Sequence, residues 1–347
     1  MAKCQISRGK ATTIPLHRVT LLRPYMQFLS DVGTPIEREL HRAGLPIHAI
    51  DDVNNYVPSR CFWAFVMNTV HNQGITDLGF RVGMPFGANA IDPNLRDLIR
   101  RSPTLYAAVQ VASEIATKTI ANTRAGLRQS PCGWNTHLYY FPSCGAHSTV
   151  TGQIGWYALT SWLGLVRAFT GPQWCPTEIG VMTSQIPSSF ISEQLPGTRI
   201  RLSQPYTYIT LEKQLLSLPP IPSQAAKPGP SPFGYESVPM DLAGSLEHAL
   251  VSYFGEVRPT IEFASELCNK SSRTLQRRLK ESGTCYSKVL NQARFHSASR
   301  MLKDRDMNIA DIARFLGFIN PTHFSRAFRG IAGVSPREYR QQHTNLD

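Results

Sequence analysis

Two segments near the end of the chain repeat one layout of apolar, turn-forming and capping residues. They cover residues 261–281 (IEFASELCNKSSRTLQRRLKE) and residues 309–329 (IADIARFLGFINPTHFSRAFR). In each segment, small apolar residues at helical spacing are followed by Asn or Gly, which tolerate the left-handed conformation that a tight turn needs. A capping residue then opens a second helix. The repeat predicts two helix-turn-helix units, in which a short turn joins two helices.

The second helix of each unit has one apolar side. Leu275 and Leu279 form the predicted buried side in the first unit, and Phe324 and Phe328 form it in the second. The remaining side chains of these two helices are polar or basic, and they comprise Arg273, Gln276, Arg277 and Lys280 in the first and Thr322, His323, Arg326 and Arg329 in the second. Polar and basic residues of this kind commonly form only a solvent-exposed helix face. The alternative is that they contact a polyanion.

The residues between the two units complete an all-helical domain. Residues 286–303 have apolar residues at helical spacing and predict one rigid helix that joins the units. Residues 270–303 hold nine Lys or Arg and one Glu, whereas residues 304–347 hold six bases and five acids. Basic charge is therefore concentrated on the first unit and the joining helix, where it favours a polyanionic partner.

A run rich in proline separates this domain from the rest of the chain. Residues 218–239 (LPPIPSQAAKPGPSPFGYESVP) contain seven prolines and two glycines, which can neither continue a helix nor fill a central strand. The run is predicted to be a linker. The predicted domains are residues 1–218, a linker at residues 219–239, and residues 240–347.

The part before the linker predicts an α+β domain. Helical spacing of apolar residues recurs at residues 20–31, 35–43, 58–73 and 104–119, and a buried helix is predicted at residues 155–169. Stretches rich in β-branched and aromatic residues predict strands at residues 137–141, 177–182 and 206–211.

Composition excludes several classes of protein. Seven cysteines without a CxxC pair indicate reduced thiols, and we expect neither a disulfide framework nor a metal site. The longest apolar stretch, residues 154–166, falls short of the ~20 residues that span a bilayer, and the N-terminus lacks the apolar run of a signal peptide. We therefore expect a soluble, cytoplasmic protein without membrane contact. A formal charge of +12 favours nucleic acid or an anionic surface as partner.

No motif of a known enzyme class stands out in the chain. The sequence contains no GxSxG, HExxH, P-loop or GxGxxG motif, and its Ser, His and Asp residues are scattered. We predict that the protein is not an enzyme and needs no cofactor.

The second unit closely resembles the signature of the AraC/XylS family of bacterial transcription regulators. Its characteristic residues stand at fixed spacing as Gly317, Phe318, Phe324, Arg326, Phe328, Arg329, Gly333, Ser335, Pro336, Tyr339 and Arg340. The stretch SSRTLQRRL in the first unit resembles a form common in one branch of that family. The resemblance implies a DNA-binding domain whose two units enter successive major grooves ~34 Å apart.

By position, the resemblance implies which residues contact double-stranded DNA. The predicted set comprises Ser272, Arg273, Gln276, Arg277, Lys280, Asn320, Pro321, Thr322, His323, Arg326 and Arg329. Pro321 has no side-chain donor, so its contact is expected to be apolar, for example with a thymine methyl group. Gly330 is a poor helix former and is expected to end the second recognition helix early.

The part before the linker resembles the regulatory domain, labelled arabinose-binding, of a branch of the same family. The stretches that carry the resemblance are GLPIHAIDDVNNYVPSRCFWAFV, DLGFRVG and SPTLYAAV. The resemblance implies control by a small-molecule effector or by dimerisation, and RNA polymerase as a partner. An activator is expected, with an effector-independent repressor and an adaptor that does not bind DNA as alternatives.

An effector pocket is predicted among the aromatic and basic residues of this domain. The proposed lining is Trp134, Tyr139, Trp156, Trp162, Arg199 and Arg201. Arginines here, including Arg124 and Arg128, would suit an acidic effector. The alternative is that the aromatic residues are ordinary core.

Overall fold

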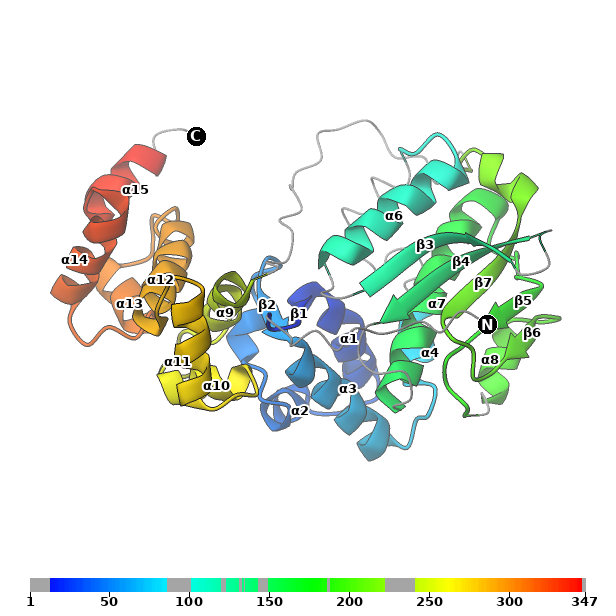
Figure 1. Cartoon of the computed structure of the whole chain (residues 1–347), viewed down its shortest axis with the longest axis horizontal. Helices are drawn as coiled ribbons and strands as arrows, with labels where there is room; N and C mark the ends of the chain where they lie inside the picture. The colour runs from blue at the N-terminus through cyan, green and yellow to red at the C-terminus, as the bar shows by residue number, and fades with distance from the viewer. Residues whose placement is uncertain are drawn as a thin grey trace. The chain divides into compact units, whose positions relative to one another are not determined.

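The structure is a computed structural model that describes residues 13–85, 101–119, 123–130, 133, 135–142, 149–185, 188–221 and 241–344 (Figure 1). Its residues form two compact units. The sheet unit contains the described residues of Thr20–Gly44 and Arg60–Val238, and the helical unit contains those of Met1–Val19, Leu45–Ser59 and Pro239–Asp347. Residues 222–240, which hold most of the predicted linker, lie outside the described residues. The domain boundaries at 218 and 240 therefore stay a prediction.

The sheet unit is built on a five-stranded sheet. Its strands are β3 (Thr123–Gln129), β4 (Asn135–Pro142), β5 (Glu178–Gly180), β6 (Arg199–Arg201) and β7 (Thr207–Glu212), and they lie side by side in the order β3-β4-β7-β5-β6. The β3-β4, β4-β7 and β7-β5 pairs are antiparallel, and the β5-β6 pair is parallel.

Helices pack against one face of this sheet and complete the core. The helices of the unit are α1 (Arg23–Asp31), α2 (Ile36–Arg42), α3 (Ser59–Gln73), α4 (Leu78–Gly83), α6 (Leu105–Thr119), α7 (Thr149–Thr170) and α8 (Ser189–Gln194), with short 3-10 turns at Val19–Leu22 and Lys213–Ser217. Leu138 on β4 and Ile209 on β7 are fully buried in one cluster with Leu159 of α7 and Val109 of α6. Because side chains alternate along a strand, the residues next to Leu138 and Ile209 lie on the opposite face of the sheet.

The predicted α+β class is confirmed for this unit. The four predicted helices that precede the sheet correspond to α1, α2, α3 and α6, the predicted buried helix is part of α7, and the three predicted strands are β4, β5 and β7. The strands β3 (TRAGLRQ) and β6 (RIR) were not predicted, because they are basic and poor in β-branched residues. Their pairing with β4 and β5 supplies the stability that their own sequences lack.

The helical unit contains the two predicted helix-turn-helix units. Its helices are α9 (Leu242–Val251), α10 (Ile261–Leu267), α11 (Ser272–Glu281), α12 (Tyr286–Met301), α13 (Ile309–Phe315), α14 (Pro321–Ala332) and α15 (Pro336–Thr344). The described residues from 241 onward form no strand, as predicted. The long α12 joins the units and buries Val289, Ala293 and Ala298 on one side.

Residues from the start of the chain belong to the same unit. The strands β1 (Leu16–Arg18) and β2 (Tyr56–Pro58) pair antiparallel, with a 3-10 turn at Ile47–Ile50 between them in sequence. The Ser252 hydroxyl after α9 donates a hydrogen bond to the Tyr56 carbonyl oxygen at 2.6 Å. Arg300 of α12 lies 2.9 Å from an Asp52 carboxylate oxygen and donates to the Asn55 side chain at 3.1 Å. These contacts join residues about 200 or more positions apart, and no local sequence pattern predicts them.

Membrane, cysteine and metal features can be stated for the described residues. No helix among them combines the length and the apolarity that crossing a bilayer requires. Cys61, Cys175, Cys268 and Cys285 are free thiols, whereas Cys4, Cys132 and Cys144 lie outside the described residues. Within the same part of the chain, no group of three His, Cys, Asp or Glu side chains is placed to hold a metal ion.

Candidate nucleic-acid interface

The first helix-turn-helix unit consists of α10, a short turn and α11. Asn269 in the turn has φ +50°, the left-handed conformation predicted for it. The Ser271 side chain caps α11 by accepting a hydrogen bond from the Thr274 N–H at 3.3 Å. Leu275 and Leu279 are fully buried and fix α11 to the unit. Burial of this pair orients the opposite side of α11 toward solvent.

The outward side of α11 carries the predicted contact residues. Arg273, Gln276, Arg277 and Lys280 are all exposed, and Arg277 forms a loose ion pair with Glu281 at 3.8 Å. Ser272 differs, because it is half-buried and its hydroxyl lies 3.2 Å from the Ser265 hydroxyl. An ion pair between two exposed side chains contributes little and can be exchanged for a phosphate.

The second unit consists of α13, a turn and α14. Gly317 ends α13 with φ +76°, a conformation that favours glycine. The Asn320 side chain accepts a hydrogen bond from the Thr322 N–H at 2.8 Å, and Pro321 follows as the first helical residue. The cap and the proline stand where the sequence predicted them. α14 runs to Ala332, so the expectation that Gly330 ends it early was wrong, and Gly333 ends it instead with φ +77°.

The outward side of α14 is also polar. Pro321, Thr322, His323, Arg326 and Arg329 are exposed, and Arg329 lies 3.5 Å from Glu338 of α15. On the inward side, Phe324 and Phe328 are 1% and 2% exposed. The helix is therefore held by two aromatic rings, and its polar side, on which only Arg329 has an ion-pair partner among the described residues, is exposed to solvent.

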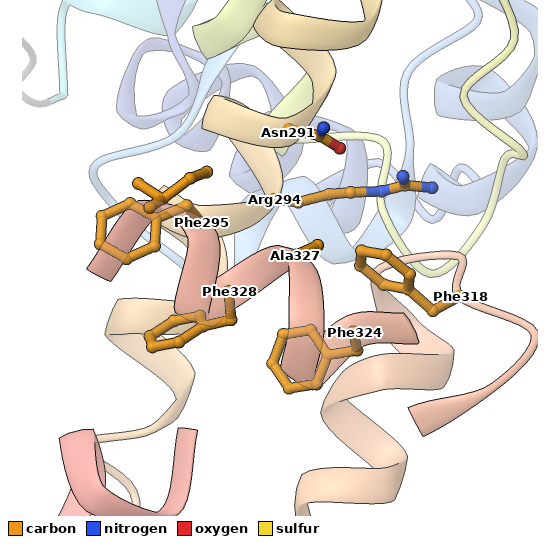
Figure 2. Close-up of a pocket in the computed structure, with 8 residues that line it drawn as sticks. Asn291, Arg294, Phe295, Phe318, Phe324, Ala327 and Phe328 are labelled. Atoms are coloured by element: carbon orange, nitrogen blue, oxygen red, sulfur yellow. The ribbon is translucent and has the colours of Figure 1, made fainter. Parts of the chain in front are cut away.

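A cluster of aromatic rings fixes the orientation of α14 on α12. The Phe328 ring lies 5.1 Å from that of Phe295, and the Phe324 ring lies 5.5 Å from that of Phe318. These rings line a small hollow, shown in Figure 2, whose other lining residues are Asn291, Arg294, Ala327 and Ile331. Phe324 and Phe328 project from α14 toward this cluster, so they set which side of α14 faces outward.

Two of the basic residues of α12 have structural roles. Arg294 donates to the Leu316 carbonyl oxygen at 3.0 Å and lies over the Phe318 ring at 4.2 Å, and burial lowers the pKa of its guanidinium group. Arg300 is bound by Asp52 and Asn55. The high charge of residues 270–303 therefore overstates what is available to a polyanion.

The end of the family signature is also structural. Arg340 donates to the carbonyl oxygens of Leu302 and Met307 at 3.3 and 2.6 Å, and so holds the loop between α12 and α13. At the start of α15, the Ser335 N–H donates to Glu338 at 2.7 Å and the Glu338 N–H donates to the Ser335 hydroxyl at 3.3 Å. This reciprocal pair is a capping box, and its hydrogen bonds lower the pKa of the Glu338 carboxyl.

The structure does not bring the predicted effector residues together. Trp134 lies outside the described residues. Trp156 and Trp162 of α7 are 4% and 3% exposed and belong to the core cluster on one face of the sheet. Tyr139, Arg199 and Arg201 lie at strand positions that alternate with core residues, on the other face.

That second face carries an aromatic and charged cluster, for which the sequence indicated Tyr139 and the arginines but not His137, Glu178, Tyr206 or Tyr208. The His137 and Tyr208 rings stack with centroids 3.9 Å apart, and His137 Nδ1 lies 3.2 Å from the Tyr206 hydroxyl. Tyr208 donates to Glu178 at 2.9 Å, and Arg201 donates to the same carboxylate at 2.8 Å. Partial burial raises the pKa of the Glu178 carboxyl, but these two hydrogen bonds outweigh it and leave that pKa below its usual value.

The cluster extends from β6 at one edge of the sheet to β3 at the other edge. Arg128 of β3 is exposed and lies over the Tyr206 ring at 5.5 Å. Gly180 leaves room for Tyr208, because a Cβ atom at this position would overlap the tyrosine ring. Because side chains alternate between the two faces along each strand, these residues lie on one face of the sheet. Which of them are neighbours depends on the pairing and register of the strands.

The helical unit contains two helix-turn-helix units, whose second helices are α11 and α14, and the long α12 joins them. This arrangement defines the class of double helix-turn-helix proteins. Residues 265–342 match the model of a helix-turn-helix domain, and residues 33–220 match the model of the N-terminal arabinose-binding domain of AraC transcription regulators. The chain belongs to the AraC family of transcription regulators.

Two individual relatives match this chain over fewer than 90 residues each. The transcriptional activator NphR of Rhodococcus sp is 34% identical over 87 residues, which is 25% of this chain and 26% of that protein. The ornithine utilization regulator of Pseudomonas aeruginosa is 36% identical over 83 residues, 24% of each chain. The chain thus covers about a quarter of the length of these relatives. Among solved structures, the transcriptional regulator CdpR from Pseudomonas aeruginosa is similar at 15% identity and a TM-score of 0.38, over 93% of this chain and 98% of that one.

Proposed function

We propose that this protein is a sequence-specific DNA-binding transcription regulator that acts as an activator. The observation that carries the proposal is the matched construction of α11 and α14. Each helix is fixed by two buried apolar side chains, and each presents exposed polar and basic residues on its other side. This construction suits insertion of both helices into major grooves, where side chains contact base edges.

The proposed contacts divide by chemistry. Arg273, Gln276, Arg277, His323 and Arg326 are exposed and have side chains that can donate to base edges. Lys280 and Arg329 lie toward the ends of their helices and suit phosphate contacts, as does Thr322 in the first turn of α14. Ser272 and Asn320 act through backbone placement, because their side chains are hydrogen-bonded within the protein. Pro321 offers an apolar contact.

The remaining parts of the proposal follow from family membership. Members of this family are transcription regulators rather than enzymes, and we propose that this chain is no enzyme and works in the cytoplasm. As an activator it would contact RNA polymerase. A single copy carries two recognition helices and can occupy a two-part site, and a homodimer would pair two such sites. An adaptor that does not bind DNA would have no use for the two exposed basic helix faces.

The proposal is tested by selection of DNA from a random duplex pool with the full-length protein. We expect enrichment of a two-part sequence, because each recognition helix covers only a few base pairs. Affinity for that sequence should fall with rising salt. The logarithm of the binding constant should decrease by ~0.9 per neutralised phosphate for each tenfold increase in salt concentration. Selection that enriches no sequence over several rounds, with binding equal to that of unrelated DNA, would contradict the proposal.

Regulation is proposed to use the second face of the five-stranded sheet. Its half-buried rings, Tyr139 and Tyr206, can stack on a planar ligand, and the buried His137 and Tyr208, stacked on each other, pack beside Tyr206. Exposed Arg128 at one side supplies positive charge, whereas Arg199 and Arg201 at the other are already paired with Glu178. This arrangement favours an aromatic carboxylate as effector, with Arg128 as its anchor.

This effector assignment predicts that the full-length protein is stabilised against heat by aromatic carboxylates. A ligand at a hundred times its Kd adds about 2.7 kcal/mol to the free energy of unfolding. Benzoate, phenylacetate, salicylate and indole-3-acetate are to be compared with acetate and hexanoate in thermal melts. Arg128→Ala should remove the effect, and Arg60→Ala, which alters an exposed arginine of α3 in the same unit, should keep it. If no aromatic acid raises the melting temperature, the effector assignment is wrong and dimerisation becomes the favoured role.

A further inference from the structure

The turn before α14 exposes an isoleucine almost completely. Ile319 is 94% exposed, whereas the other large exposed hydrophobic side chains among the described residues are between 36% and 51% exposed. A single exposed apolar residue is common on protein surfaces and by itself indicates nothing. The position of Ile319 next to the recognition helix is what makes its exposure informative.

The turn of the second unit is longer than that of the first. In the first unit, only Lys270 separates the left-handed Asn269 from the capping Ser271. In the second, both Phe318 and Ile319 stand between the left-handed Gly317 and the capping Asn320. The second turn thus has room for one inward and one outward side chain.

Phe318 takes the inward position. Its ring packs 5.5 Å from that of Phe324, and the Arg294 guanidinium lies over it at 4.2 Å, as Figure 2 shows. This anchoring fixes the backbone of the turn. Ile319 is left directed to solvent immediately before the end of α14 that a recognition helix inserts into the groove.

Pro321, two residues further on, adds apolar surface at the same end of α14. Asn320 Oδ1 is already an acceptor for the Thr322 N–H. Pro321 is exposed and has neither a backbone N–H nor a polar side chain. Ile319 and Pro321 therefore form an apolar tip at the N-terminal end of α14, with Arg326 one turn further along.

We infer that the apolar tip reads thymine through its 5-methyl group, with Ile319 as a specificity-determining residue. This inference rests on the proposed function. The thymine methyl is the apolar group that a base pair presents in the major groove, and it is the natural partner for a tip that cannot donate hydrogen bonds. The half-site under the second unit should accordingly contain thymine at one or two fixed positions, while the first unit, with Arg273, Gln276 and Arg277, reads polar base edges.

The test replaces each thymine of the selected site, one at a time, with deoxyuracil. Deoxyuracil keeps every hydrogen bond of thymine and lacks only the methyl group. For the natural protein, we expect about a fourfold loss of affinity at each contacted thymine, the equivalent of one buried methyl or methylene group. These thymines should lie under the second unit only.

Two variants test whether the preference for thymine depends on Ile319 or on any exposed apolar residue of this region. Ile319→Ser should lose most of the preference for thymine over deoxyuracil, because only Pro321 of the apolar tip then remains. Ile331→Ser changes another exposed isoleucine, near the far end of α14, and should keep the full thymine preference. Ile319 makes no buried contact, so Ile319→Ser should melt at the temperature of the natural protein.

Several results would overturn the inference while leaving the proposed function intact. One is a selected half-site without thymine, and another is equal affinity for all deoxyuracil sites. A third is an Ile319→Ser variant that keeps its thymine preference but fails to activate transcription with purified RNA polymerase, which would assign the tip to a protein contact. Failure to select any sequence would instead refute the proposed function, and this inference with it.

Discussion

Replacement of Arg273, Arg277 and Arg326 together by alanine is expected to reduce discrimination between the selected site and unrelated DNA at least about a hundredfold. All three side chains are exposed on the outward sides of α11 and α14. A side chain that contacts a base edge well contributes ~1–3 kcal/mol of discrimination. The triple variant should therefore lose at least about a hundredfold in specific affinity even if the contacts are at the weak end of that range.

The control is a triple variant with the same change of charge. Arg305, Arg314 and Arg337 are exposed in the same helical unit but lie outside the two recognition helices. Their replacement by alanine should lower affinity for all sequences alike, through the loss of general attraction to phosphates. Titration of both variants against selected and unrelated duplexes at one salt concentration separates the two effects. Equal behaviour of the two variants would show that the recognition faces carry no base readout.

The second large effect concerns the stability of the unit that presents α14. Phe324→Ala is expected to lower the free energy of unfolding by ~3–5 kcal/mol, because the ring is 1% exposed and its removal leaves a cavity. Its ring also packs against the rings of Phe318 and Phe328, with centroids 5.5 and 5.8 Å apart, so the alanine variant loses these contacts as well. Urea unfolding followed by circular dichroism measures the change.

Two matched variants make that result specific. Phe324→Leu keeps most of the apolar volume and should cost clearly less than the alanine variant. His323→Ala removes the neighbouring exposed side chain and should leave stability within about 0.5 kcal/mol. If Phe324→Ala lost less than about 1 kcal/mol, the anchoring of α14 by its aromatic side would be refuted.

Local sequence rules predicted the helical unit well because its elements depend on neighbours in the chain. The left-handed Asn269 and Gly317, the capping Asn320 and the buried Phe324 all follow from residue type and helical spacing. Gly330 is the exception. Glycine is unfavourable inside a helix, but α14 continues past Gly330 because Gly333 provides a better end.

Features set by distant residues escaped prediction. Arg294 and Arg300 count as free positive charges in the sequence, yet one clamps Leu316 and Phe318 and the other binds Asp52 and Asn55. The sequence alone does not distinguish an arginine that binds groups within the protein from one that contacts DNA. Only the fold shows which carbonyl oxygens, rings and acids lie within its reach.

The same limit applies to the sheet unit. Aromatic content suggested a pocket that combined Trp156 and Trp162 with Arg199 and Arg201. The tryptophans lie in the core cluster, whereas the arginines occupy β6, a strand whose basic sequence has weak strand propensity. Which rings and charges share a face depends on strand register, and β3 and β6 join the sheet only through their partners.

The most direct measurement of the central claim is a hydroxyl-radical footprint of the full-length protein on its selected DNA. Two recognition helices held on one rigid α12 should protect two segments on the same face of the duplex, about 10–10.5 base pairs apart. Arg273→Ala and Arg277→Ala together should remove one protected segment, and Arg326→Ala should weaken the other. A single protected segment, or protection that both sets of variants reduce equally, would contradict the two-helix account.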